Sequence, residues 1–222
     1  MRPIGITTLL LTFAASFADS ATFIAADRLF TAHVTGNFIV LVYDIIHHVG
    51  RNEWSKLLAF PVFFLAVMAA GKFNHRGENP YRLLQLEGGL LLLAGFGAVA
   101  MRLLHVRAEG LLFGLSMTIV IAMAFQNAFG RLYAKDIYGP TTVMTGNVTS
   151  AALDIADLLW TRPRDADKLL KLQHNLAVIL VFLVGCLSGG FLSWHFGLIT
   201  VLLPGGLLLS YFSYIRRTKV VV

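Results

Sequence analysis

The chain has 222 residues, of which 57% are hydrophobic and only 14% are charged, whereas soluble domains carry about 25% charged residues. The apolar residues come in long blocks, which disfavours a water-soluble globule and predicts a polytopic membrane protein. The net charge of +6 does not indicate a nucleic-acid partner, because the basic residues fall between the apolar blocks, where they orient a membrane protein. A single cysteine, Cys186, excludes a disulfide framework and a cysteine metal cluster.

Six apolar stretches are candidates for transmembrane helices, which need roughly 20 residues to cross a bilayer. They cover residues 4–26, 57–71, 83–101, 110–130, 176–194 and 196–215. The second is short and contains Pro61, which indicates tilting or extension at its ends. The fold class is therefore an all-α polytopic membrane protein with one membrane domain over residues 1–222. An alternative interpretation of the start is a signal peptide cleaved after Ala18.

The tripeptide Thr-Gly-Asn occurs twice, as Thr35-Gly36-Asn37 and Thr145-Gly146-Asn147, 110 residues apart. In each half an aspartate follows seven residues after the asparagine, as Asp44 and Asp154. Seven residues are two helical turns, so the asparagine and the aspartate share a helix face. The spacing therefore predicts two internal repeats, over about residues 1–105 and 106–222.

Each tripeptide follows an apolar span with polar residues near its end, Asp19 in the first half and Gln126 with Asn127 in the second. Glycine permits unusual backbone angles and asparagine is a preferred N-cap, so a helix is expected to start at each motif. The segments 38–49 and 148–160 are then helices of roughly 18–20 Å, too short for a bilayer core of about 30 Å. We predict that they are re-entrant or interfacial.

Three spans in each repeat require the second copy to insert upside down, so the repeats are expected to be inverted. Inverted repeats with broken helices that meet near the midplane are typical of secondary transporters. We expect the two turns to approach one another there and to offer N–H groups, amides and hydroxyls to a small polar or anionic solute. The candidate substrate-binding residues are Thr35, Gly36, Asn37, Gln126, Asn127, Thr145, Gly146 and Asn147. The candidates for proton or ion coupling are Asp19, Asp44 and Asp154.

Two further groups of ionisable residues have competing interpretations. Glu87 lies one turn into a predicted span, where three interpretations stay open: a functional role, a side chain that reaches the membrane interface, and pairing with Arg82. Asp44, His47 and His48 have a spacing that could bring a carboxylate and an imidazole to one metal. A solvated helix end is the preferred interpretation, because the second half has no matching histidine, and no metal or cofactor is predicted.

The basic residues orient the six-span topology. Of the 18 Lys and Arg residues, 13 fall on the side that holds both termini, and the positive-inside rule places that side in the cytoplasm. Glu53 and Arg107 are then periplasmic, and Arg164 and Arg217 are cytoplasmic. If both short helices crossed the membrane, eight spans would result and Glu53 would be cytoplasmic.

Four segments carry a resemblance to a known family: residues 17–23 (Phe-Ala-Asp-Ser-Ala-Thr-Phe), 33–37 (His-Val-Thr-Gly-Asn), 126–128 (Gln-Asn-Ala) and 140–149 (Pro-Thr-Thr-Val-Met-Thr-Gly-Asn-Val-Thr). On these the chain resembles the YoaK-type family of uncharacterised bacterial membrane proteins with six transmembrane segments. The resemblance implies the bacterial cytoplasmic membrane and supplies no activity. It also leads us to expect glycines near residues 25–28, where this chain has Ala25, Ala26, Asp27 and Arg28.

The leading functional hypothesis is a small transporter or permease in the lipid bilayer, with its site between the two Thr-Gly-Asn turns. The alternative is a non-transporting membrane scaffold in which the repeated turns only join the two halves. An intramembrane enzyme ranks last, because no nucleophile–base motif or phosphate loop is present. A homo-oligomer is compatible with either leading hypothesis.

Overall fold

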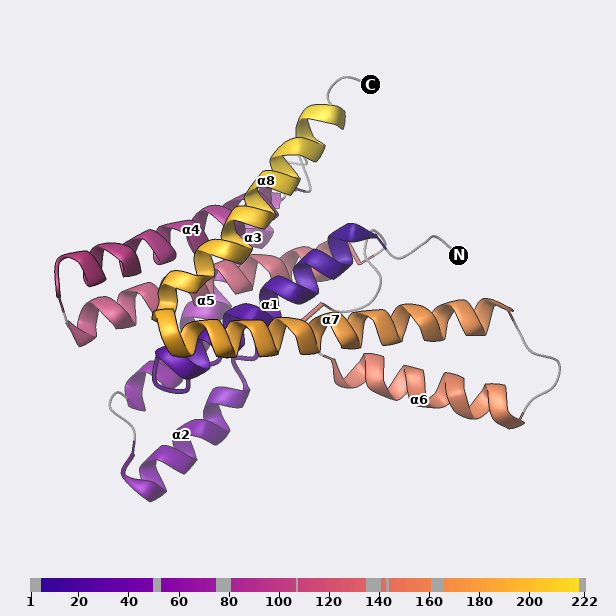
Figure 1. The fold of residues 1–222 in the computed structure, drawn as a ribbon, viewed down its shortest axis with the longest axis horizontal. Coiled ribbons are helices and arrows are strands. Elements are labelled where there is room, and N and C mark those ends of the chain that lie inside the picture. Colours follow the sequence, from indigo (N-terminus) through magenta and orange to yellow (C-terminus); the bar gives the residue numbers. More distant parts are fainter. Residues whose placement is uncertain are drawn as a thin grey trace.

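The computed structural model describes residues 5–49, 53–74, 81–106, 108–134, 141–142, 144–160 and 166–219. These ranges contain helices and connections but no strand (Figure 1). The elements are α1 (Ile6–Ala25), α2 (Gly36–His47), α3 (Glu53–Asn74), α4 (Arg82–Leu103), α5 (Glu109–Leu132), α6 (Thr145–Trp160), α7 (Ala166–Phe196), the 3₁₀ helix η1 (Gly197–Val201) and α8 (Leu202–Lys219). Of the residues used to orient the chain, Arg107 and Arg164 lie outside the described ranges.

The long helices confirm an all-α, multi-pass membrane protein. Five stretches are long and apolar enough to cross a bilayer, namely α1, α3, α4, α5 and the 52-residue stretch Ala166–Arg217. That last stretch contains both of the spans expected at the C-terminal end. It is interrupted at η1, where Gly197 has a φ of +64°, and α7 and α8 run in different directions on either side of the turn (Figure 1).

The helices pack in pairs that cross between the two halves of the chain. α1 packs along α7, α3 packs along α5, and α4 packs against both α5 and α8. α1 and α5 are the most deeply buried of the long helices, with side chains such as Leu11, Phe17, Ile119 and Met123 fully buried. These two helices are also the ones that carry the candidate polar residues near their ends.

Glycines allow the closest helix contacts in the bundle. A Cβ atom on Gly185 would lie 2.8 Å from the backbone oxygen of Phe13, and one on Gly189 would lie 2.8 Å from the Cα atom of Phe17. Gly88 plays the same role between α4 and α8, where a Cβ atom would lie 2.8 Å from the backbone nitrogen of Leu209. Backbones therefore touch at these crossings, as in other membrane helix pairs with small residues.

The two short helices that follow the Thr-Gly-Asn motifs are present. α2 has 12 residues and α6 has 16, which correspond to about 18 and 24 Å, less than the hydrocarbon core of about 30 Å. Each packs against the helix that follows it, α2 on α3 and α6 on α7. In Figure 1 they leave the bundle on different sides, α2 toward the lower left and α6 toward the right.

The expected details of these helix starts are wrong. α2 begins at Gly36 and α6 at Thr145, earlier than predicted, so neither asparagine is an N-cap. The cap of α2 is Thr35, which makes no side-chain capping bond. Among the described residues the only glycine with positive φ is Gly197, so neither Gly36 nor Gly146 is needed for a left-handed backbone.

Candidate functional site

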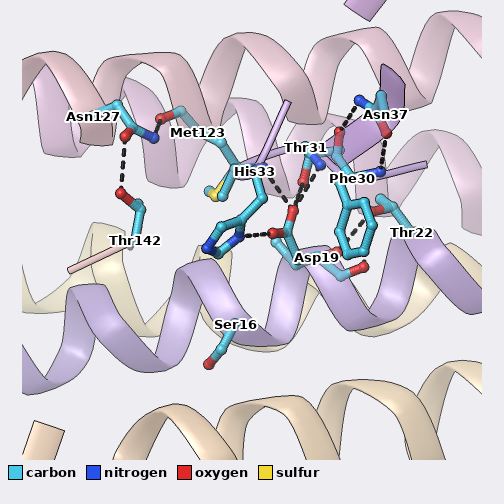
Figure 2. Close-up of polar contacts among 12 residues, drawn as sticks. Ser16, Asp19, Thr22, Phe30, Thr31, His33, Asn37, Met123, Asn127 and Thr142 are labelled. Carbon is cyan, nitrogen blue, oxygen red and sulfur yellow. Dashed lines mark hydrogen bonds and ion pairs between the residues drawn. The ribbon is translucent and has the colours of Figure 1, made fainter. Parts of the chain in front are cut away.

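Asp19 anchors the loop between α1 and α2. Its side chain comes from the last two turns of α1 and is only 4% exposed. One carboxylate oxygen, Oδ1, accepts hydrogen bonds from the backbone nitrogens of Thr31 and Ala32, both at 2.6 Å, and from the Thr31 hydroxyl at 3.1 Å. The other, Oδ2, pairs with Nδ1 of His33 (Figure 2). Because a buried carboxylate needs such partners, Asp19 folds residues 26–35 back against α1.

His33 connects the loop before α2 to the loop before α6. Its imidazole pairs with Asp19 and also hydrogen-bonds the backbone of Thr142, so the ring lies between the two (Figure 2). The edge of the ring faces Phe182 on α7, with ring centroids 6.0 Å apart. The side chain is 30% exposed, which leaves part of the imidazole open. The loops that precede the two Thr-Gly-Asn turns are therefore in contact.

α5 anchors the second loop much as α1 anchors the first. Nε2 of Gln126 donates to the Thr141 hydroxyl at 3.0 Å and to the backbone oxygen of Leu11 at 2.8 Å. The Thr142 hydroxyl donates to Oδ1 of Asn127 at 2.9 Å (Figure 2). Gln126 is fully buried, and its Oε1 atom has no hydrogen-bond partner among the described residues. A buried amide oxygen of this kind can accept a further hydrogen bond.

The sequence predicted Asp19, Gln126 and Asn127 but missed the threonines that they hold. Thr31 and Thr141 are 110 residues apart, the spacing of the two motifs. The signal was therefore present, because the repeated pattern is Thr-x-x-x-Thr-Gly-Asn. His33 has no counterpart in this pattern, which is why spacing alone did not select it.

The side chain of Asn37 bonds the backbone of the loop that precedes it. It is fully buried, its Oδ1 accepts from the Phe30 backbone nitrogen at 2.8 Å, and its Nδ2 donates to the Phe30 backbone oxygen at 2.8 Å (Figure 2). Asn147 is also buried, and its Nδ2 lies 3.6 Å from the Met144 sulfur. Both asparagines are buried, whereas Thr35 and Thr145 are exposed.

The two motif glycines differ in their surroundings. A Cβ atom on Gly36 would lie 3.2 Å from the ring of Phe30, whereas one on Gly146 would meet nothing within 4 Å. Close approach therefore explains the glycine in the first turn. Nothing in the structure explains it in the second.

Asp44 and Asp154 tie the two short helices to the helices that follow them. Asp44 is fully buried and lies 2.8 Å from both Arg28 and Lys56. Asp154 lies 3.5 Å from Lys171, and its other oxygen accepts from Asn175 at 3.3 Å. The two aspartates thus have equivalent positions in the repeat, but Asp44 forms the stronger tether, because only Asp44 is part of a fully buried ion pair.

The turn after α1 adopts the conformation expected of the missing glycines. Asp27 and Arg28 have φ values of +54° and +58°, a region that residues other than glycine seldom adopt. Lys56 bridges Asp27 and Asp44 at 2.8 Å each, and Arg28 pairs with Asp44. These four residues, hereafter the charge network, hold the turn by ion pairs in place of glycine's conformational freedom.

Glu87 on α4 is the other buried carboxyl group. It is fully buried, and neither oxygen has a hydrogen-bond partner among the described residues. Full burial is inconsistent with the alternative in which its side chain reaches the interface. An ionisable group in this position is costly, and no polar partner explains its presence.

The described residues thus form a multi-helix membrane protein in which the two loops that lead into the Thr-Gly-Asn motifs contact one another. The chain belongs to the DUF1275 family, which is described as proteins of unknown function and whose model matches residues 7–214. The match to this family agrees with the resemblance to a family of uncharacterised membrane proteins that the sequence motifs indicate. No curated protein and no solved structure matches the chain.

Proposed function

We propose that this protein is a small transporter or permease for a small polar solute. Its two halves, about residues 1–105 and 106–222, are an inverted repeat with six membrane spans, three in each half. The solute site lies where the loop anchored by Asp19 meets the loop anchored by Gln126 and Asn127. The protein resides in a bacterial cytoplasmic membrane with both termini in the cytoplasm, and no enzymatic step is part of the proposal.

The pattern of helix packing supports the inverted repeat. Exchanging the two halves maps α1 onto α5, α2 onto α6, α3 onto α7 and α4 onto α8. Under this exchange the α1–α7 contact becomes the α5–α3 contact, and the α2–α3 contact becomes the α6–α7 contact. The α4–α8 contact maps onto itself, and all of these contacts are present. A pseudo-two-fold axis produces this exchange, and three spans in each half would put that axis in the membrane plane.

The observation that carries the functional proposal is the contact between His33 and Thr142. It joins loops of the two halves next to three polar anchors, of which Asp19 and Gln126 are buried and Asn127 is half-buried. Polar groups of this kind are expensive inside a membrane and mark solute or ion pathways. The short helices α2 and α6 start beside these loops, and their N-terminal N–H groups favour polar or anionic solutes.

One observation favours the scaffold instead. Asn37, Asp44 and Asp154 are all engaged with other parts of the protein. If every polar residue of the repeated pattern only fastened a loop or a helix, no solute would be needed. The two functions differ in whether solute accumulates behind a sealed membrane.

Uptake into proteoliposomes separates the two. Vesicles with the purified protein are offered a defined mixture of amino acids, polyamines, organic acids and nucleosides, and their contents are measured by mass spectrometry. We expect at least one solute to accumulate above protein-free vesicles, and Asn127→Leu to abolish its uptake. Thr118→Val is the matched control, because Thr118 lies on the same helix and bonds only the backbone of Gly114. No accumulation of any solute by the parent protein would favour the scaffold.

A further inference from the structure

A cavity of about 350 Å³ lies at the end of the bundle where α1 ends and α3 and α5 begin. Its walls come from the last residues of α1 and the turn after it, the first turn of α3 and the first two turns of α5. Because helix ends face the membrane surface, the cavity opens toward water rather than toward the lipid interior. Its size is within the range of pockets that bind small molecules.

The charged side chains on the cavity wall are acidic. Asp27 and Glu109 are the two charged residues among those that line it. The basic members of the charge network, Arg28 and Lys56, do not line the cavity, and Lys56 is fully buried behind Asp27. The charge network contains two acids and two bases and is neutral as a whole. Together with Glu109, the described residues around the cavity therefore have a net charge of −1.

The rest of the cavity wall has both polar and apolar side chains, which favours an amphipathic ligand. The hydroxyl groups of Ser55 and Ser116 belong to the lining, and Ser116 is only 3% exposed. Leu29, Leu112 and Phe113 supply an apolar side, and an aromatic ring also attracts cations over its face. Asp27, which has a φ of +54°, lines the cavity, and unusual backbone conformations of this kind cluster at ligand sites.

We propose that this cavity, the vestibule, binds a small organic ammonium ion. The ammonium group lies between the carboxylates of Asp27 and Glu109, and its apolar part lies against Leu112 and Phe113. The ligand is a free amine or the ethanolamine headgroup of a lipid, since both present the same ammonium group. The inference rests on the proposed function only in treating the vestibule as an entrance, and it narrows the substrate class to polar solutes that carry an ammonium group.

Binding is tested in nanodiscs of phosphatidylcholine that contain the full chain. Benzylammonium is titrated by calorimetry, with empty nanodiscs as the blank and benzyl alcohol as the uncharged analogue. We expect benzylammonium to bind at least tenfold more tightly than benzyl alcohol. Phosphatidylethanolamine is added in a second set of nanodiscs. Competition there assigns the natural ammonium to lipid, and its absence assigns it to a free solute.

Three variants locate the site. Glu109→Gln is expected to weaken benzylammonium binding at least threefold, and Asp27→Asn with Glu109→Gln at least tenfold, because each removes one carboxylate. Ser116→Phe fills the vestibule without changing its charge and is expected to abolish binding. Glu53→Gln is the matched control, since Glu53 begins α3 as Glu109 begins α5 but does not line the cavity.

Equal binding of benzyl alcohol, or parental affinity in the double variant, would overturn the proposal. Thermal unfolding of each variant shows whether a loss of binding reflects a loss of fold. Failure here is distinct from failure of the transport proposal. Ammonium binding without uptake of any solute would support the vestibule site and overturn the transport proposal. Uptake without ammonium binding would support the transport proposal and overturn the vestibule site.

Discussion

His33 and Thr142 are in contact, although they are 109 residues apart and belong to different halves of the chain. The contact exists because polar side chains draw each loop inward, the buried Asp19 on α1 for the first loop and the buried Gln126 with the half-buried Asn127 on α5 for the second. The two anchored loops are thereby brought to the same place. This relationship is the basis of the first prediction.

A His33→Cys, Thr142→Cys double variant in a Cys186→Ser background is expected to form an intramolecular disulfide under mild oxidation. Non-reducing electrophoresis after a single protease cut between the two cysteines reads the result. The control pair is His33→Cys with Trp160→Cys, because Trp160 ends α6, about 22 Å along the helix from its start. Equal cross-linking of both pairs would show that the loops do not have this specific contact.

Asp44→Asn is expected to destabilise the protein far more than Asp154→Asn. Asp44 is fully buried between two cations, and breaking a buried ion pair costs about 3–5 kcal/mol. Asp154 pairs at 3.5 Å with Lys171, whose side chain is 43% exposed, and such a pair contributes about 0–1 kcal/mol. Chemical denaturation of both variants in detergent measures the two free energies of unfolding. Similar losses would mean that Asp44 is not the stronger tether.

Asn37→Ala is expected to lower the free energy of unfolding by more than a lost helix cap, which costs about 1 kcal/mol. The substitution leaves the buried N–H and C=O groups of Phe30 without their partner, at about 1–3 kcal/mol for each unsatisfied group. Thermal unfolding in detergent checks this. Asn37→Asp is the informative companion, because it keeps an acceptor for the Phe30 N–H but replaces the donor with a buried carboxylate oxygen that faces the Phe30 carbonyl, and it is expected to destabilise the protein as well. Parental stability of Asn37→Ala would contradict the assigned role.

Most of the architecture could be predicted from the sequence because it follows from local patterns. Apolar length identified the membrane helices, and the spacing of Asp44 and Asp154 from their asparagines placed both on short helices beside the next span. The partners of those aspartates could not be predicted. Lys56 is 12 residues from Asp44 and Lys171 is 17 residues from Asp154, so no common spacing marks them, and tertiary packing alone brings them together.

The candidate site was predicted in part for the same reason. Asp19, Gln126 and Asn127 are polar residues in apolar spans, a signal that burial cost makes visible. The roles of the two motifs were not visible, because the sequence does not show which atom of Asn37 meets which backbone group. Asp27 and Arg28 adopt positive φ only because Lys56 and Asp44 hold them, and that compensation is also tertiary.

Gly185→Ala is expected to lower stability, whereas Gly190→Ala on the same helix is expected to be neutral or stabilising by up to about 1 kcal/mol. An added methyl group at Gly185 would lie 2.8 Å from the Phe13 backbone oxygen, so α1 and α7 would have to separate. Nothing lies within 4 Å of the same atom at Gly190. Unfolding temperatures of the two variants in detergent give the comparison, and equal values would show that the α1–α7 crossing tolerates the added volume.

A Glu53→Cys variant is expected to react with a membrane-impermeant maleimide in intact bacterial cells, and an Arg217→Cys variant only after permeabilisation. Both are made in a Cys186→Ser background, so that each protein has one thiol. The expectation follows from six spans, since α2 has 12 residues, about 18 Å, and is too short to cross a core of about 30 Å. Residue 53 then stays on the side of the membrane reached by the end of α1. The positive-inside rule makes that side periplasmic, because 13 of the 18 Lys and Arg residues fall on the other. A Glu53→Cys thiol that reacts only after permeabilisation would place it in the cytoplasm. That result would require α2 to cross the membrane, and the two halves would then have the same orientation instead of being inverted.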